Sequence, residues 1–172
     1  MTVNEFVKWI YPQAKLAGDI DPIFTTAQAA LESGWGKAAI GNNLFGITKG
    51  GSWRGPVQLV TTTEFFSTPT VKFTAPEAVI SVTKLKDRCY KYKVKRFFRL
   101  YNTAAEGLKD HAAILQKPQF KDAWAYRHDA RQFVRKLQDN INSKYATDIN
   151  YVATMDKMFA MVESAVKQLK LG

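Results

Sequence analysis

The sequence predicts an α+β fold that is mainly helical, with a strand-rich lobe inserted near the middle of the chain. Apolar residues recur at helical spacing towards both ends of the chain, between recognisable helix-capping residues. From about residue 42 to 101, glycine and proline turn signals instead separate runs of β-branched and aromatic residues. Because 172 residues suffice for one domain with a substantial core, we expect a single domain over residues 1–172.

The first two predicted helices are bounded by strong capping signals. Thr2-Val3-Asn4-Glu5 forms a capping box, and Gly18 suits the end of a helix that Pro12 should kink. Asp21-Pro22 starts the second helix, which must end near Ser33-Gly34-Trp35-Gly36 because glycine interrupts it twice there. Their buried stripes are expected to contain Phe6, Ile10, Ala14, Ala17, Ile23, Ala27, Ala30 and Leu31.

The inserted lobe is predicted to contain two β-hairpins. Residues 57–66 form one strand, with residues 71–73 as its partner. Residues 79–83 and 90–98 form the second hairpin, which turns around Lys86-Asp87.

Three helices are predicted after the lobe. Thr103 and Glu106 form a capping box for a helix that stops before Pro118, and Asp129 caps the next helix. The last helix should cover about residues 150–171. The residues expected to be buried are Leu108, Ala112, Leu115, Phe133, Val134, Leu137, Ile141, Val152, Met155, Met158, Phe159, Met161, Val162, Val166 and Leu169, together with Trp9 and Trp124.

The chain carries a formal net charge of +10, which implies an anionic partner or surface. Nucleic acid, an acidic membrane and the wall of a bacterium all fit this charge. Part of it lies in a run where Tyr90 and Tyr92 alternate with basic residues, a pattern that suits a wall polymer, nucleic acid or a solvated strand face. The basic residues of this run are Lys91, Lys93, Lys95, Arg96 and Arg99.

Several kinds of site are not expected. Cys89 is the only cysteine, and neither His111 nor His128 has a Glu or Cys at ligand spacing, so we expect no metal site and treat both histidines as structural or surface residues. The N-terminus lacks the segments of a signal peptide, and no stretch reaches the about 18 apolar residues of a membrane span. We therefore expect synthesis in the cytoplasm, without a signal peptide or membrane insertion.

Glu32 carries the clearest chemical signal. It falls in the last turn of the second helix, where unpaired carbonyl groups disfavour a carboxylate, and an indole from Trp35 packed against it would remove water. Both effects raise the pKa of a carboxyl group, and an acid that stays protonated near neutral pH can protonate a glycosidic oxygen. An ordinary surface glutamate at a helix end is the alternative.

A series of short motifs spans nearly the whole chain. They are Ala30-Leu31-Glu32-Ser33-Gly34-Trp35-Gly36, Asn43-Leu44-Phe45-Gly46-Ile47, Trp53-Arg54-Gly55-Pro56, Thr61-Thr62-Thr63-Glu64-Phe65, Phe98-Arg99-Leu100-Tyr101 and Tyr145-Ala146-Thr147-Asp148 with Tyr151. In this order they resemble family 73 of the glycoside hydrolases, the peptidoglycan β-N-acetylglucosaminidases of bacterial autolysins, phage endolysins and flagellar hydrolases.

The resemblance implies a lysozyme-like helical body, with the catalytic acid at Glu32 and the hairpin lobe beside the active-site cleft. Glu64 stands where the family often places a second acidic residue, and strand alternation puts it on one face with Thr62, from which it could activate water as general base. An exposed strand glutamate is the alternative. Tyr145 matches a tyrosine that lines the family's active site and could bind the acetamido group of the substrate or steady an intermediate.

The resemblance further implies an endo-β-N-acetylglucosaminidase that cuts the GlcNAc-β-1,4-MurNAc backbone, and we expect a monomeric phage endolysin whose partners are peptidoglycan glycan strands. The alternatives are a muramidase or lytic transglycosylase on the same fold, or a non-catalytic wall-binding module. No cofactor and no nucleic-acid partner is expected. The substrate-binding residues would be Trp35, Asn43, Phe45, Trp53, Thr62 and Tyr151.

Overall fold

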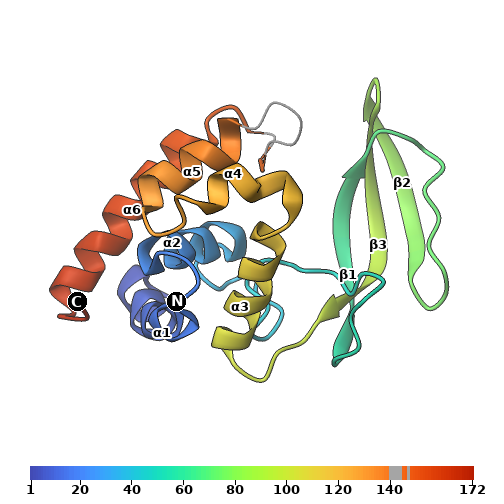
Figure 1. The fold of residues 1–172 in the computed structure, drawn as a ribbon. Coiled ribbons are helices and arrows are strands. Elements are labelled where there is room, and N and C mark those ends of the chain that lie inside the picture. The colour runs from blue at the N-terminus through green and yellow to red at the C-terminus, as the bar shows by residue number, and fades with distance from the viewer. Residues whose placement is uncertain (140–144, 147) are drawn as a thin grey trace. The chain divides into compact units, whose positions relative to one another are not determined.

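A computed structural model describes residues 1–139, 145–146 and 148–172 (Figure 1). The chain divides into two compact units, which we call the helical unit (residues 1–46 and 101–172) and the strand unit (residues 47–100). The predicted mainly helical α+β class is confirmed, and the strand unit falls inside the lobe expected at residues 42–101. The predicted positions of Ile141 and Thr147 lie outside the described residues.

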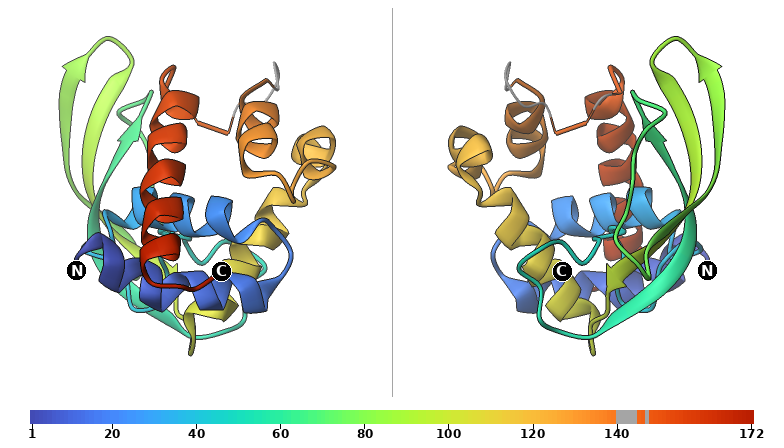
Figure 2. Two further views of the ribbon diagram at one scale, coloured as in Figure 1. Left: turned by 90° about the vertical axis from the view of Figure 1, so that its left-hand side faces the viewer. Right: turned by 90° about the vertical axis from the view of Figure 1, so that its right-hand side faces the viewer.

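In the helical unit, α2 packs against α1, α5 and α6 (Figures 1 and 2). The helix that carries Glu32 is therefore a central one. Among the described residues, no helix combines the length and the apolar character needed to cross a bilayer. The helices are α1 (Val3–Ala17), α2 (Pro22–Ser33), α3 (Ala104–Leu115), the 3-10 turn η1 (Pro118–Phe120), α4 (Lys121–Trp124), α5 (Ala130–Asp139) and α6 (Tyr151–Gln168).

Local capping fixes where these helices begin. The predicted box at Thr2 is confirmed, because Thr2 Oγ1 accepts from the Glu5 N–H and the Glu5 carboxylate accepts from the Thr2 N–H at 2.7 Å. Asp21 caps α2 with its side chain, whose Oδ1 accepts hydrogen bonds from the N–H groups of Ile23 and Phe24. At α3 only half of the predicted capping box forms. Thr103 Oγ1 accepts from the Glu106 N–H, but the Glu106 carboxylate accepts from the N–H of Asn102 instead of that of Thr103.

The hydrophobic core of the helical unit contains most of the residues that helical periodicity predicts. Phe24 lies at its centre, with its ring centroid 4.7 Å from that of Phe133. The prediction for Met161 was wrong, since it is 41% exposed. Met161 lies about 120° around α6 from the fully buried Met155, so it points away from the stripe that faces the core.

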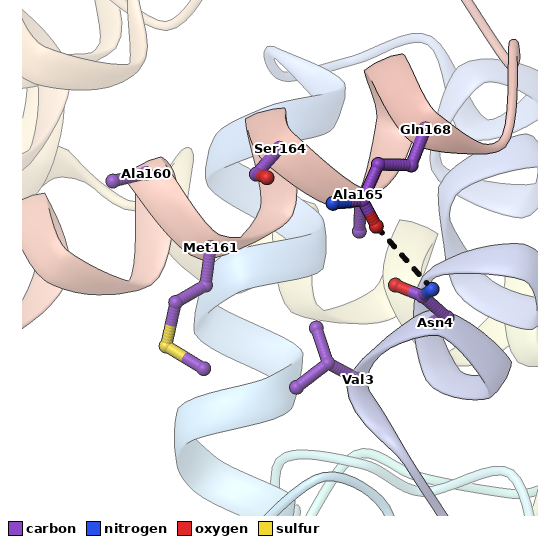
Figure 3. Close-up of a pocket in the computed structure, with 7 residues that line it drawn as sticks. All are labelled: Val3, Asn4, Ala160, Met161, Ser164, Ala165 and Gln168. Atoms are coloured by element: carbon purple, nitrogen blue, oxygen red, sulfur yellow. Dashed lines mark hydrogen bonds between the residues drawn. The ribbon is translucent and has the colours of Figure 1, made fainter.

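Met161 instead lines a shallow groove between the start of α1 and the C-terminal half of α6 (Figure 3). A 3.5 Å hydrogen bond from Asn4 to Gln168 crosses it. The described residues that line the groove include no acidic or basic side chain, so acid–base chemistry has to be sought elsewhere. The lining residues are Val3, Asn4, Ala160, Met161, Ser164, Ala165 and Gln168.

The strand unit is built on a three-stranded antiparallel sheet of β1 (Val57–Phe66), β2 (Ala78–Lys86) and β3 (Cys89–Arg99). The order is β1-β3-β2, with β3 in the middle (Figure 1). The predicted hairpin of β2 and β3 is confirmed. The predicted pairing of residues 57–66 with 71–73 was wrong, because β1 pairs along its whole length with β3.

Residues 67–77 connect β1 to β2 and contact the sheet instead of forming a strand. The hydroxyl of Tyr92 on β3 donates to the Thr68 carbonyl at 2.8 Å and accepts from the Val71 N–H at 3.2 Å. Tyr92 is fully buried as a result. Strand alternation turns it away from the exposed Lys91 and Lys93 on either side of it in the sequence.

Candidate active site

The end of helix α2 holds Glu32 in its last turn. Gly34 caps the helix in the left-handed conformation, with φ +56°, which glycine adopts without strain. The N–H of Trp35 donates to the Ala30 carbonyl at 2.8 Å, and the Gly36 N–H donates to Ser33 Oγ at 2.9 Å. The chain therefore leaves α2 directly after Ser33, one residue beyond Glu32, through contacts that satisfy backbone groups of the turn.

The carboxyl group of Glu32 has its pKa raised by desolvation, because surrounding protein removes part of its water. Glu32 nevertheless keeps an exposed surface, so the residue is open to solvent. The Trp35 indole, which we expected beside it, packs edge to face on Phe6 of α1 with ring centroids 5.6 Å apart. The pKa of Glu32 is raised, as expected, but the cause is burial and not the carbonyl groups of the helix end.

Two tyrosines and a glutamine lie close to Glu32 in the helical unit. Gln28, one helical turn before Glu32, donates to the Tyr151 hydroxyl at 3.1 Å, and the rings of Tyr145 and Tyr151 are 5.7 Å apart. Burial raises the pKa of both phenols, and the negative charge of Glu32 raises it further. Both hydroxyls therefore keep their protons and can act as hydrogen-bond donors.

His111 joins two of the predicted site residues, although the sequence analysis assigned it no functional role. Its Nε2 lies 3.2 Å from the Tyr145 hydroxyl, and its ring stacks on Phe45 with centroids 3.7 Å apart. Burial lowers the pKa of His111 to about 3, so the imidazole is neutral. The available signal was its place on the apolar stripe of α3 with Leu108, Ala112 and Leu115, which predicts burial.

Two predicted substrate-binding residues of the helical unit are buried. Asn43 is 1% exposed and exchanges backbone hydrogen bonds with Ile40, and Tyr151 is 4% exposed. Both side chains are therefore covered by protein in this structure. Direct contact of either side chain with a sugar stays a prediction.

In the strand unit, Glu64 lies on the same sheet face as Thr62, as alternation predicts. Its carboxylate is bound by Arg96 of β3, whose Nη1 is 2.9 and 3.1 Å from the two oxygens. Arg96 had been grouped with the surface lysines of the basic run. The sequence cannot predict this ion pair, because it depends on the strand order and register.

Trp53 is fixed in the loop that precedes β1. Its Nε1 donates to the Pro56 carbonyl at 3.0 Å, and the Arg99 guanidinium lies 4.9 Å from its ring. Gly55 is required there, because a Cβ atom at this position would lie 2.5 Å from the indole. The predicted stacking of a sugar on Trp53 stays a prediction.

The predicted site residues thus form two groups. Glu32, Tyr145 and Tyr151 belong to the helical unit and are coupled electrostatically, with Phe45 joined to Tyr145 through His111. Trp35 and Asn43 also belong to the helical unit, whereas Trp53, Thr62 and Glu64 belong to the strand unit.

Comparison with known proteins places this chain among glycoside hydrolases. The model of the glucosaminidase family, described as mannosyl-glycoprotein endo-beta-N-acetylglucosaminidase, matches residues 8–164. The glycoside hydrolase domain from Salmonella typhimurium FlgJ is 28% identical and has a TM-score of 0.73, covering 99% of this chain and 94% of that one.

Two curated relatives are considerably longer than this chain. The peptidoglycan hydrolase FlgJ of Escherichia coli (strain K12) is 32% identical over 145 residues, which cover 80% of this chain and 39% of the relative. A probable N-acetylmuramidase of Lactococcus lactis is 26% identical over 170 residues, which cover 92% of this chain and 33% of the relative. The chain therefore spans only about two fifths or less of each.

Proposed function

The chain belongs to the glucosaminidase family, family 73 of the glycoside hydrolases, and from this premise we propose that it hydrolyses the glycan backbone of peptidoglycan as an endo-β-N-acetylglucosaminidase. The bond cut is the β-1,4 linkage from GlcNAc to MurNAc. The observation that carries the proposal is the desolvated carboxyl group of Glu32, reachable from solvent and close to two protonated phenols.

Glu32 is proposed to protonate the glycosidic oxygen as the bond breaks. A raised pKa keeps the carboxyl group protonated until the transition state, where the leaving oxygen becomes basic. Tyr145 would donate a hydrogen bond to the acetamido group, with its hydroxyl held by His111. Together these groups act on the substrate from the helical unit.

Glu64 is proposed as the general base that activates water on the other face of the sugar. An inverting reaction of this kind needs the two carboxyl groups about 6.5–9.5 Å apart when substrate is bound. If the acetamido oxygen attacks instead, Glu64 is not needed as a base and Tyr145 becomes the more important partner. Glu64 lies in the strand unit, where Arg96 donates hydrogen bonds to both oxygens of its carboxylate.

A muramidase is the second candidate, because the relative from Lactococcus lactis carries the name of probable N-acetylmuramidase. Mass spectrometry of digested peptidoglycan separates the candidates. A glucosaminidase leaves reducing GlcNAc ends, a muramidase leaves reducing MurNAc ends, and a lytic transglycosylase leaves anhydro-MurNAc ends. We expect reducing GlcNAc, and either kind of MurNAc end as the main product would overturn the proposed bond specificity.

The role of a monomeric phage endolysin stays a prediction. The chain, expressed in bacteria whose inner membrane is then permeabilised, should lyse them, whereas Glu32→Gln should not. Light scattering on the purified protein should give a mass near the 19.4 kDa of one chain.

A further inference from the structure

Arg96 on strand β3 is held by two carboxylates of the strand unit. Its Nη1 contacts both oxygens of Glu64, at 2.9 and 3.1 Å, and its Nε donates to Glu77 at 3.1 Å. The three side chains are only 19%, 24% and 22% exposed, for Arg96, Glu64 and Glu77 respectively. Most of this cluster is therefore shielded from solvent, unlike an ordinary surface ion pair.

The sheet register shows that Arg96 and Glu64 reach each other along the strands. Glu64 lies opposite Tyr92, Arg96 lies opposite Val60, and the pair of Thr62 and Val94 stands between these two pairs. Both long side chains must therefore lean over the Thr62–Val94 pair to meet. The ion pair removes most of the rotational freedom that a strand glutamate would otherwise have.

The segment from β1 to β2 holds Arg96 from its other side. Glu77, at the end of this segment, accepts from the backbone N–H of Phe97 at 2.7 Å as well as from Arg96. The ring of Phe73 lies 4.3 Å from the Arg96 guanidinium, within the range of a cation–π contact, and also packs near Phe66. The guanidinium is therefore fixed by an anion, an aromatic face and the strand that carries it.

We propose that Arg96 is a positioning residue that holds the Glu64 carboxylate in its working orientation, and that residues 67–77 serve to fix Arg96. This inference rests on the proposed function, in which Glu64 is the general base. Lysine could not replace arginine fully, because one ammonium group cannot hold two carboxylates with the geometry of a planar guanidinium.

A double-mutant cycle tests the proposal. The variants are Arg96→Gln, Arg96→Lys and Glu77→Gln, each made in the wild type and in Glu64→Gln, with kcat and KM measured on a soluble peptidoglycan fragment. Lys8→Gln is the matched control, because Lys8 is an exposed cation of α1 that lies outside both the proposed site and the basic run. Thermal unfolding of each variant shows whether the fold is retained.

Arg96→Gln should lower kcat about tenfold to a hundredfold with little change in KM. When it is added to Glu64→Gln, it should cause no further loss of kcat. Arg96→Lys should recover part of the activity, and Glu77→Gln should cost less than Arg96→Gln. Lys8→Gln should keep the wild-type kcat. If Arg96→Gln does not fold, Arg96→Lys and Glu77→Gln carry the same cycle.

If Arg96→Gln lowered kcat equally in the wild type and in Glu64→Gln, the positioning role would be overturned. A rise in KM with unchanged kcat would overturn it as well. Full activity of Glu64→Gln would overturn it too, because no base would then need positioning. Full activity of Glu32→Gln would instead overturn the proposed function itself, so the two failures are distinguishable.

Discussion

The helical unit and the strand unit differ sharply in charge. Residues 47–100 contain eleven Lys and Arg against three Asp and Glu, a net charge of +8, whereas the rest of the chain contributes only +2. All three acidic residues of the strand unit, Glu64, Glu77 and Asp87, form ion pairs with basic neighbours. Lys91, Lys93 and Lys95 lie together on one exposed face of β3.

The two units also differ in packing. The large hydrophobic cluster among the described residues belongs to the helical unit. In the strand unit Tyr92, Val94 and Phe98 are buried, whereas Leu59, Phe65, Ile80, Val82 and Leu85 are exposed. A packed helical core can desolvate a carboxyl group and hold neutral polar side chains beside it. A thin, basic sheet can instead attract an anionic polymer. We therefore propose that the helical unit carries the acid chemistry and that the strand unit supplies most of the electrostatic attraction to the wall.

The largest expected effect is that of Glu32→Gln, which tests whether chemistry belongs to the helical unit. The amide keeps the shape of the side chain but has no proton to transfer, so turnover should fall by about a thousandfold or more. Binding to whole walls and the unfolding temperature should stay near those of the wild type. Near-normal turnover of the folded variant would contradict the assignment.

A smaller effect is expected from Glu64→Gln, which tests what the strand unit adds to the chemistry. If Glu64 is the general base, the chemical step should slow by about a hundredfold, and azide should restore activity with inverted product. If the acetamido group attacks instead, Glu64→Gln should be mild and Tyr145→Phe more damaging. Both variants should be measured on one defined glycan, and full activity of both would leave only Glu32 as a catalytic residue.

Replacing Lys91, Lys93 and Lys95 by glutamine tests the electrostatic side of the comparison. Affinity for walls at low salt should fall roughly tenfold, and its dependence on salt should weaken, because exposed charges are screened beyond about 10 Å at 0.1 M. The matched control replaces Lys8, Lys157 and Lys167, three exposed lysines of the helical unit. Equal loss in both triple variants would mean that net charge alone matters and that the strand face has no special role.

The smallest effect concerns His111 and the stability of the helical unit. Its pKa is lowered to about 3 by burial, so below pH 6.5 the unfolded chain takes up a proton that the folded chain does not. The free energy of unfolding should therefore fall as pH drops towards 3, by at most about 1.4 kcal/mol per pH unit from this residue. Denaturant unfolding should show this slope in the wild type and in His128→Gln, where the replaced histidine is exposed, but a weaker one in His111→Gln.

Sequence reasoning predicted the helical unit better than the strand unit, because helix ends depend on local contacts. The caps at Thr2, Asp21 and Asp129 accept hydrogen bonds from backbone N–H groups within three residues. The turn that ends α2 just after Glu32 depends on the local glycine at position 34. The exceptions are features that depend on tertiary structure. Met161 was placed in the core although it lies off the stripe of α6, and the contact of His111 with Tyr145 joins residues 34 positions apart.

The strand unit was predicted less well, because its contacts depend on strand order. The bounds of β1 were correct, yet its partner lies more than 20 residues beyond its end instead of across the next turn. That pairing decides which face Tyr92 occupies and brings Arg96 to Glu64. A sequence pattern gives the alternation of a strand, but the register that fixes these neighbours comes from the folded sheet.

The most direct test of the central claim is the titration of Glu32 itself. The carboxyl carbon of Glu32, assigned by comparison with Glu32→Gln, should be followed by NMR over pH and compared with the pH dependence of kcat/KM. Because desolvation raises its pKa, Glu32 should titrate above the ordinary range for glutamate. Activity should fall as pH rises through that same value, since the acid must be protonated to act. Titration at or below the ordinary value, or an alkaline limb that does not follow Glu32, would contradict the account.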